Sequence, residues 1–364
     1  MRNGRVIAGV AGAFLALFAI DAAFFRTSLY PSLVEPESTT GSVEIMTYVE
    51  RNRQPSRPLQ ALVFGNSRMG FLPRLATEVG AGHGLEFGSL AVPGTSPRCW
   101  FYELRDIDPE ARRYAAIVLP VEDYDDEDRA ENPDDAISDL HYAIARLRIG
   151  DVLDFARSYH SWRFRWVAFR GSLLKGAVYK DDLQAFLLDP DARRRKVRLF
   201  RSDWVNWFRA FQGTAVNVDG LEVDWATGGI IYPPGATPKE RKTLYDVLLR
   251  QPAPQTGRLA EYQRLWLGRI IDRYRGTRTK VIFFRLPRGP VVRPTPLVRP
   301  RSSSIREFAA RPNVMLLDEH AFEAIERTDC FGDPLHMNAK GMSLFSRMLA
   351  ARVIESLRLE NAVQ

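Results

Sequence analysis

Short runs of apolar residues alternate with helical patterns over much of this chain. Each run ends at glycine, proline or a polar loop, as buried strands of a parallel sheet do. Five such runs lie within residues 61–70, 85–97, 114–124, 279–290 and 313–322. Because helical patterns separate them, we predict an α/β fold with three layers, α/β/α, in which a central parallel sheet lies between two layers of helices. In such folds the chemistry lies on loops at the carboxyl ends of the strands.

The middle of the chain departs from this rhythm. Residues 131–275 are mostly helical in pattern and rich in tryptophan and arginine, which predicts a large helical insertion, or cap. It would separate two halves of the sheet domain, residues 59–130 and 276–364. Four tryptophans fall in pairs that share a helix face, Trp162 with Trp166 and Trp204 with Trp207. Such pairs suit a hydrophobic seam within the cap, a sugar-stacking platform or a membrane-interface belt.

The N-terminus is predicted to be a membrane anchor over residues 1–28. Residues 6–20 carry no charge and no proline, and the apolar run resumes after Asp21. A helix of about 20 residues rises about 30 Å, enough to cross the hydrocarbon core of a bilayer. Arg2 and Arg5 precede the run, so the N-terminus should stay in the cytoplasm, with Asp21 near the far interface. A cleaved signal peptide and a buried helix of a soluble protein are the alternatives.

Residues 29–58 are predicted to be a linker. They contain four prolines and a polar stretch, with one short helix at about residues 42–52. We find no second run in the sequence that is apolar and long enough to span a bilayer. We therefore expect a single-pass protein of the inner (cytoplasmic) membrane, with most of the chain in the periplasm or outside the cell.

Composition narrows the range of partners. The net charge is +7, and only seven of the 51 basic residues are lysines. Such an arginine excess suits anionic lipid or an anionic polymer, and equally a GC-rich genome. The basic residues are scattered and match no nucleic-acid-binding signature, so we expect no nucleic-acid partner. Cys99 and Cys330 lack metal or redox spacing, and they could form one disulfide or remain two buried thiols.

A candidate catalytic group is divided between the two halves of the sheet domain. Ser67 directly follows a strand, at a turn that would expose its hydroxyl above the sheet. A serine hydroxyl needs a base to act as a nucleophile, and His336 is the candidate. Asp333 precedes His336 by three residues, so its carboxylate can orient the imidazole and stabilise its protonated form. Asp318 and His320 are the main competitors for these roles.

These motifs together resemble one family. The block Gly-Asn-Ser at 65–67, after the first strand, and Asp-Pro-Leu-His at 333–336, before the last helix, are similar to those of the SGNH/GDSL hydrolase-like superfamily. The resemblance covers about residues 60–125 and 278–355 and leaves out the middle of the chain. It implies a flavodoxin-like three-layer fold and a catalytic triad of serine, histidine and aspartate.

The same resemblance implies further site residues. The backbone N–H groups of Ser67 and Gly94 would form the oxyanion hole. The family's asparagine after the third strand has no evident counterpart, because Glu122 follows that strand here. Three arginines near the strand ends are candidates for binding an anionic or sugar substrate, or for surface ion pairs: Arg68, Arg285 and Arg288. No metal and no cofactor are predicted.

A serine-triad domain behind one membrane span resembles the periplasmic partners of membrane-bound O-acyltransferases. The function that this implies is transfer of O-acyl groups, acetyl above all, on an envelope or exopolysaccharide, with a membrane-bound O-acyltransferase as partner. A membrane-anchored esterase that removes acyl groups would use the same triad. The third alternative is a scaffold or glycan-binding component of a polysaccharide biosynthesis complex without catalysis, which the absent asparagine favours.

Overall fold

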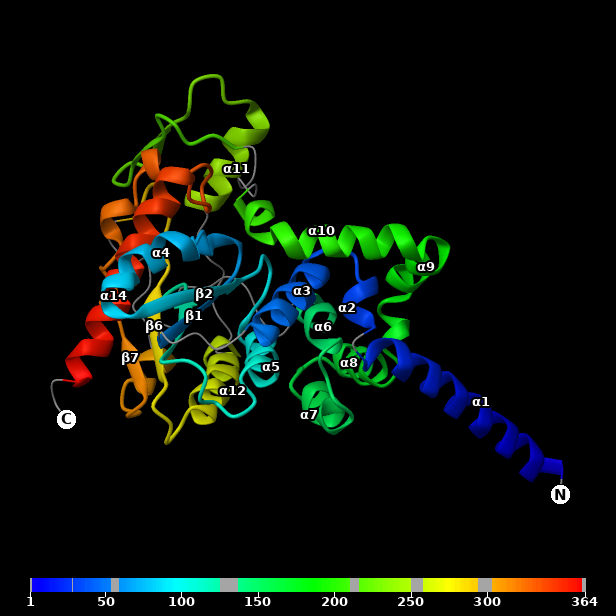
Figure 1. Cartoon of the computed structure of the whole chain (residues 1–364). Helices are drawn as coiled ribbons and strands as arrows, with labels where there is room; N and C mark the ends of the chain where they lie inside the picture. The colour runs from blue at the N-terminus through cyan, green and yellow to red at the C-terminus, as the bar shows by residue number, and fades with distance from the viewer. Residues whose placement is uncertain are drawn as a thin grey trace. The chain divides into compact units, whose positions relative to one another are not determined.

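A computed structural model describes residues 2–27, 29–53, 59–124, 137–209, 216–249, 258–293 and 303–361 (Figure 1). The chain divides into two compact units. One, called here the helical unit, comprises residues 1–53, 98–107 and 134–207. The other, the sheet unit, comprises residues 54–97, 108–133 and 208–364.

The sheet unit is built on five parallel strands, as predicted. They are β1 (Leu59–Gly65), β2 (Leu85–Ala91), β3 (Ala116–Val121), β6 (Lys280–Arg285) and β7 (Val314–Leu316). Their order across the sheet is β2-β1-β3-β6-β7, and every neighbouring pair is parallel. Counted along the chain, this is the 2-1-3-4-5 order of flavodoxin-like sheets, in which ligands bind where the order reverses, between β1 and β3. The end of β1 is therefore the expected place for a site.

Helices and a hairpin complete the sheet unit. The helices are α4 (Pro73–Gly80), α11 (Pro238–Leu248), α12 (Arg258–Arg273), α13 (Ser304–Phe308) and α14 (Ala339–Asn361). Short 3-10 turns are η1 (Ser67–Met69), η2 (Ala81–His83), η6 (Glu323–Ile325) and η7 (Thr328–Cys330). An antiparallel hairpin joins β4 (Glu222–Asp224) to β5 (Gly229–Ile231).

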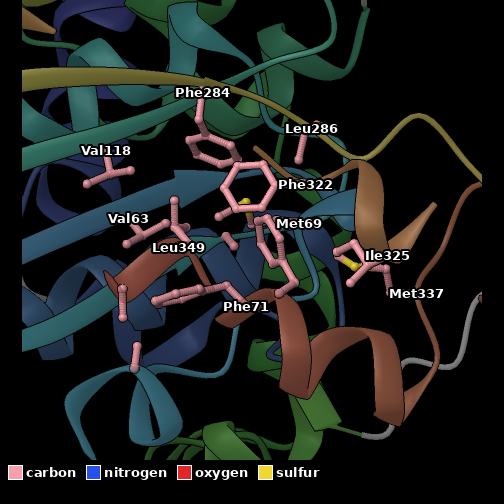
Figure 2. Packing of buried hydrophobic residues seen from close by; sticks show 14 of the residues in the cluster. Val63, Met69, Phe71, Val118, Phe284, Leu286, Phe322, Ile325, Met337 and Leu349 are labelled. Atoms are coloured by element: carbon pink, nitrogen blue, oxygen red, sulfur yellow. The ribbon is translucent and has the colours of Figure 1, made fainter. Parts of the chain in front are cut away.

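Helices cover both faces of the sheet. Alternate residues of a strand point to opposite faces, so each strand packs on both sides. On one face, Val63 and Phe284 share a buried cluster with Leu349 of α14 (Figure 2). The neighbouring residue of β6, Phe283, stacks on Phe308 of α13 with ring centroids 6.2 Å apart. Two buried faces explain why the strands are nearly continuous runs of apolar residues.

The helical unit contains nine of the described helices. They are α1 (Arg2–Phe25), α2 (Tyr30–Leu33), α3 (Thr39–Asn52), α5 (Pro97–Ile107), α6 (Ile137–Ile144), α7 (Val152–Arg157), α8 (Trp162–Leu173), α9 (Lys180–Leu188) and α10 (Pro190–Arg209). Helix α10 ends just beyond the unit. The 3-10 turns of the unit are η4 (Ile149–Asp151) and η5 (Lys175–Ala177). A buried ion pair joins α5 to α6, with Arg98 Nη1 3.3 Å from Asp139 Oδ2 and both side chains fully buried. Breaking such a pair leaves an uncompensated buried charge, so it fixes how these helices pack.

The units cut across the boundaries predicted from the sequence. Residues 29–58 were expected to be a linker, but α2 and α3 fall within them and Val43, Ile45 and Met46 are buried. The predicted insertion also divides: its residues 134–207 belong to the helical unit, whereas α11, α12 and the β4–β5 hairpin belong to the sheet unit. Segments distant in the sequence pack together here, and local patterns do not reveal such packing.

Helix α1 is long and apolar enough, over Val6–Phe25, to cross a membrane. Asp21 has a specific role in its last turns. Its carboxylate accepts hydrogen bonds from the backbone N–H of Lys175, at 3.1 Å, and of Gly176, at 2.6 Å. Only 6% of Asp21 is exposed. The carboxylate thus fastens the end of α1 to η5, a contact that the sequence did not predict.

Two further predictions from the sequence concern the cysteines and the tryptophans. Cys99 and Cys330 are both free and buried, the thiol alternative of the two predicted. Trp162 and Trp166 are 76% and 51% exposed, so they do not form a seam within a helical core. The side chains of Trp204 and Trp207 lie outside the described residues.

Buried Glu103 of α5 predicts a pH-dependent stability. Burial raises the pKa of Glu103 to about 7 from its usual 4.5, and Cys99 donates to its carboxylate. The folded state therefore keeps this proton more tightly, and the free energy of unfolding falls as pH rises from about 4.5 to 7. Glu103→Gln should be more stable than the wild type at about pH 8, by on the order of 1–3 kcal/mol, and equal to it near pH 4.5.

Thermal unfolding of the full chain in detergent at the two pH values measures this difference. Exposed Glu110 provides the matched control, since Glu110→Gln should not change the pH dependence. A Glu103→Gln variant with the same advantage at both pH values would contradict the assignment.

Candidate active site

Ser67 stands at the carboxyl end of β1, at the start of η1. The turn before it is tight: a Cβ on Gly65 would lie 2.7 Å from the Cβ of Met69, so only glycine fits without a shift. Asn66 Oδ1 accepts a hydrogen bond from the N–H of Arg68 at 3.0 Å and so caps η1. These local contacts hold the turn on which Ser67 stands.

His336 and Asp333 lie on the loop between η7 and α14. Asp333 Oδ1 accepts hydrogen bonds from the N–H groups of Leu335, at 2.8 Å, and of His336, at 2.7 Å. At the end of the loop, Asn338 Oδ1 accepts from the N–H of Gly341 at 3.0 Å and caps the first turn of α14. The loop therefore holds both side chains in a fixed turn.

The structure brings the three predicted triad residues together. His336 Nε2 lies 3.1 Å from Ser67 Oγ, and His336 Nδ1 lies 2.8 Å from Asp333 Oδ2. The Asp333 side chain is 1% exposed and that of His336 is 12% exposed. With Nδ1–H donated to the carboxylate, Nε2 is the atom that can accept the serine proton. This is the geometry of an activated serine nucleophile.

Gly94, the second predicted oxyanion donor, lies in the turn after β2. Its φ of 77° is in the left-handed region, which favours glycine. Two bonds tie this turn to the carbonyl oxygen of Gly65: Thr95 Oγ1 donates at 2.9 Å and the Val92 N–H at 3.0 Å. The loop that carries Gly94 is therefore held against the turn that precedes Ser67.

Arg68, a candidate for substrate binding or for an ion pair, is bonded to groups of the protein. Its Nη2 donates to the carbonyl oxygens of Pro287, at 3.0 Å, and of Arg288, at 3.1 Å. Its Nη1 lies 3.5 Å from Glu122 Oε2. Glu122, which the predicted family resemblance places where an asparagine is expected, thus forms an ion pair with the residue that follows the predicted nucleophile. These contacts favour a structural role for Arg68, linking the ends of β1, β3 and β6.

The other two predicted substrate-binding arginines contact carboxylates. Arg288 Nη2 lies 2.6 Å from Glu326 Oε2 and 2.9 Å from Glu323 Oε1. Arg285 Nη2 is 3.7 Å from the same Glu323 oxygen. Both match the ion-pair alternative given for them, and their charge is compensated locally.

The competing histidine is engaged elsewhere. His320 is exposed, and its Nδ1 lies 2.7 Å from Glu323 Oε1. Asp318 accepts a hydrogen bond from the backbone N–H of His320 at 2.9 Å, as in a turn, and does not orient the ring by that bond. Over the described part of the chain, no group of three or more His, Cys, Asp or Glu side chains is placed to hold a metal ion.

Three residues that shape the site were not singled out from the sequence: Asn66, Thr95 and Asn338. Asn338 had a local signal, because asparagine just before a helical pattern is typical of a helix cap. Thr95 had none, since its partner Gly65 lies 30 residues earlier in the chain.

No family model, curated protein or solved structure matches this chain. Fold and geometry alone therefore define its class: an α/β protein with a serine, histidine and aspartate constellation beyond the end of β1, and one apolar N-terminal helix. Membership of the SGNH/GDSL superfamily stays a prediction from the motifs.

The loop that carries His336 depends on a close approach at Gly341. A Cβ at Gly341 would lie 2.0 Å from the carbonyl oxygen of Cys330. Gly341→Ala should force the loop away from α14, lowering the free energy of unfolding by about 1–3 kcal/mol. Gly82→Ala is the control, because a Cβ there meets nothing within 4 Å. Thermal unfolding compares the two, and equal melting temperatures would contradict this packing.

Proposed function

We propose that this chain is a membrane-anchored serine acyltransferase or esterase of SGNH type, acting on O-acyl groups of an envelope polysaccharide. The single observation that carries the proposal is the continuous chain of bonds from Ser67 Oγ through His336 to Asp333. The flavodoxin-like strand order and the helices packed on each face support a three-layer SGNH-type domain.

In the first step, Ser67 Oγ attacks the acyl carbonyl carbon while its proton moves to His336 Nε2. The tetrahedral oxyanion would be held by the backbone N–H groups of Ser67 and Gly94. As the bond between the acyl carbon and the donor oxygen breaks, His336 returns the proton to that oxygen. Asp333 keeps the imidazole oriented and stabilises its charge while it holds the proton. The product is an acyl ester on Ser67.

In the second step, a hydroxyl group attacks the acyl ester while His336 Nε2 takes its proton. His336 then returns the proton to Ser67 Oγ, and Ser67 is released. A sugar hydroxyl makes the protein a transferase, whereas water makes it an esterase. We place the protein at the inner membrane because α1 is long and apolar enough to span it, and the sheet unit in the periplasm or outside the cell because Arg2 and Arg5 precede the apolar run. There a membrane-bound O-acyltransferase partner would supply the acyl donor.

A second candidate is a scaffold or glycan-binding component without catalysis. The ion pair between Glu122 and Arg68 favours it, because a carboxylate occupies the position where the family provides an amide donor to the oxyanion.

A fluorophosphonate probe, applied to the full-length protein in detergent, distinguishes these candidates. An activated serine should become covalently labelled, and peptide mapping should place the label on Ser67. Ser202→Ala removes an exposed serine of the helical unit and should leave labelling unchanged. A folded wild-type protein that the probe leaves unlabelled would overturn the enzymatic proposal in favour of the scaffold.

Transfer and hydrolysis are separated on the same sample. Rapid turnover of a chromogenic acetyl ester favours the esterase. Labelling of Ser67 with slow turnover favours a transferase that needs its sugar acceptor.

A further inference from the structure

The helical unit contains a cavity that the acyl chemistry does not use. Its volume is about 470 Å³, within the range of small-molecule sites. Phe25, the last residue of α1, lines it together with Arg26 and Thr27. If α1 crosses the bilayer, these residues mark the depth at which the helix leaves the hydrocarbon core. The cavity would then lie at the level of the lipid headgroups.

The charged residues that line the cavity are predominantly basic. Among its described residues are five cations, Arg26, Arg51, Arg146, Arg148 and Lys175, and two carboxylates, Glu44 and Asp106. Arg146 contacts both carboxylates, at 3.1 Å and 3.7 Å, and Arg148 contacts Asp106 at 3.4 Å. Asp106 also pairs with Arg105, at 3.4 Å, so both carboxylates already have arginine partners.

Two of the cations are instead bonded to backbone carbonyls. Arg26 donates to the carbonyl oxygens of Leu147, Ser172 and Leu173 at 2.7–3.3 Å, and Lys175 Nζ donates to that of Ala145 at 2.5 Å. Lys175 is 2% exposed. Burial, and next the positive charge of Arg26, lower the pKa of Lys175 to about 7. An anion between these two groups would stabilise both charges.

Two buried hydroxyls on the same lining also lack hydrogen-bond partners. They are Tyr30 Oη and Thr47 Oγ1, and both residues are 2% exposed. A buried hydroxyl without a partner costs about 1–3 kcal/mol, so such groups usually bond to something that occupies the space. Phosphate oxygens accept hydrogen bonds from hydroxyls and pair with cations.

We propose that this cavity binds the phosphate of an anionic phospholipid headgroup, between Arg26 and Lys175, with Tyr30 and Thr47 donating to its oxygens. The site would fix the height and tilt of the helical unit on the outer surface of the membrane. It does not depend on the triad, so Ser67→Ala should bind lipid as the wild type does.

Native mass spectrometry of the full-length protein in detergent tests this, with phosphatidylglycerol, phosphatidylcholine or inorganic phosphate added in turn. The wild type should retain phosphatidylglycerol in preference to phosphatidylcholine. The double variant Arg26→Gln/Lys175→Met should retain at least about tenfold less phosphatidylglycerol, because it removes the two cations proposed to bind the phosphate. Arg74→Gln, an exposed arginine of the sheet unit, should change nothing.

A second variant covers the case in which the first does not fold. Tyr30→Phe/Thr47→Val removes only the two hydroxyls, so without lipid it should be as stable as the wild type or more stable. Its gain in melting temperature on adding phosphatidylglycerol should be smaller than that of the wild type. An equal gain in this variant would overturn the proposal. If inorganic phosphate stabilises the wild type as strongly as phosphatidylglycerol does, the proposal that the cavity binds a lipid is overturned.

Discussion

Ser67→Ala should abolish acyl transfer or acyl-ester cleavage and leave the fold unchanged. Alanine lacks the atom that forms the acyl ester, so the covalent route is lost completely. In serine hydrolases, removing the nucleophile or its base costs about 10⁶-fold in kcat. We expect a loss of this order in the purified protein, and loss of polysaccharide acylation in cells if the protein is a transferase. Ester turnover and glycan acyl content are the measurements.

The triad should also behave as a unit. His336→Ala should cost about as much as Ser67→Ala, and the double variant should lose little more, because neither residue acts without the other. His320→Ala, which changes the exposed histidine paired with Glu323, is the matched control and should retain full activity. Activity of Ser67→Ala within about tenfold of the wild type would remove Ser67 from the mechanism.

Asp333→Asn should lower kcat by about 10⁴-fold at neutral pH, with little change in stability. Asn Oδ1 can still accept from the N–H groups of Leu335 and His336, so the turn should persist. The amide nitrogen would then face His336 Nδ1 as a donor, which makes Nδ1 the acceptor and leaves the proton on Nε2. A protonated Nε2 cannot take the proton of Ser67.

Kinetics and a folding measurement together separate this effect from simple damage. The variant should unfold at nearly the wild-type temperature while its turnover and its labelling by fluorophosphonate both fall. Asp329→Asn provides the control, because it changes an exposed carboxylate paired with Lys340 on the preceding turn. Wild-type turnover in Asp333→Asn would show that the carboxylate does not set the tautomer.

Several features could be predicted from the sequence because their signals are local. The five strands appear as apolar runs between turns, since both faces of the sheet are buried. Ser67 follows β1 directly, and Asp333 lies three residues before His336, so each part of the triad is visible in a few consecutive residues. The order of the blocks along the chain then suggested that they meet.

Other features depended on contacts between distant residues. Arg68, Arg285 and Arg288 all lie near strand ends. Only the structure shows that they form hydrogen bonds with carbonyl groups or ion pairs with carboxylates. The predicted linker became part of a packed unit for the same reason.

By itself, then, the sequence determined the strands, the apolar helix and the chemical identity of the three candidate catalytic side chains. The tertiary structure alone decided that Ser67 and His336, 269 residues apart, lie within hydrogen-bonding distance. It also decided that Asp21 fastens α1 to η5 and that Arg26 and Lys175 line one cavity. The physical reason is that hydrophobic periodicity is set by neighbours along the chain, whereas the partner of a buried charge is set by packing between segments.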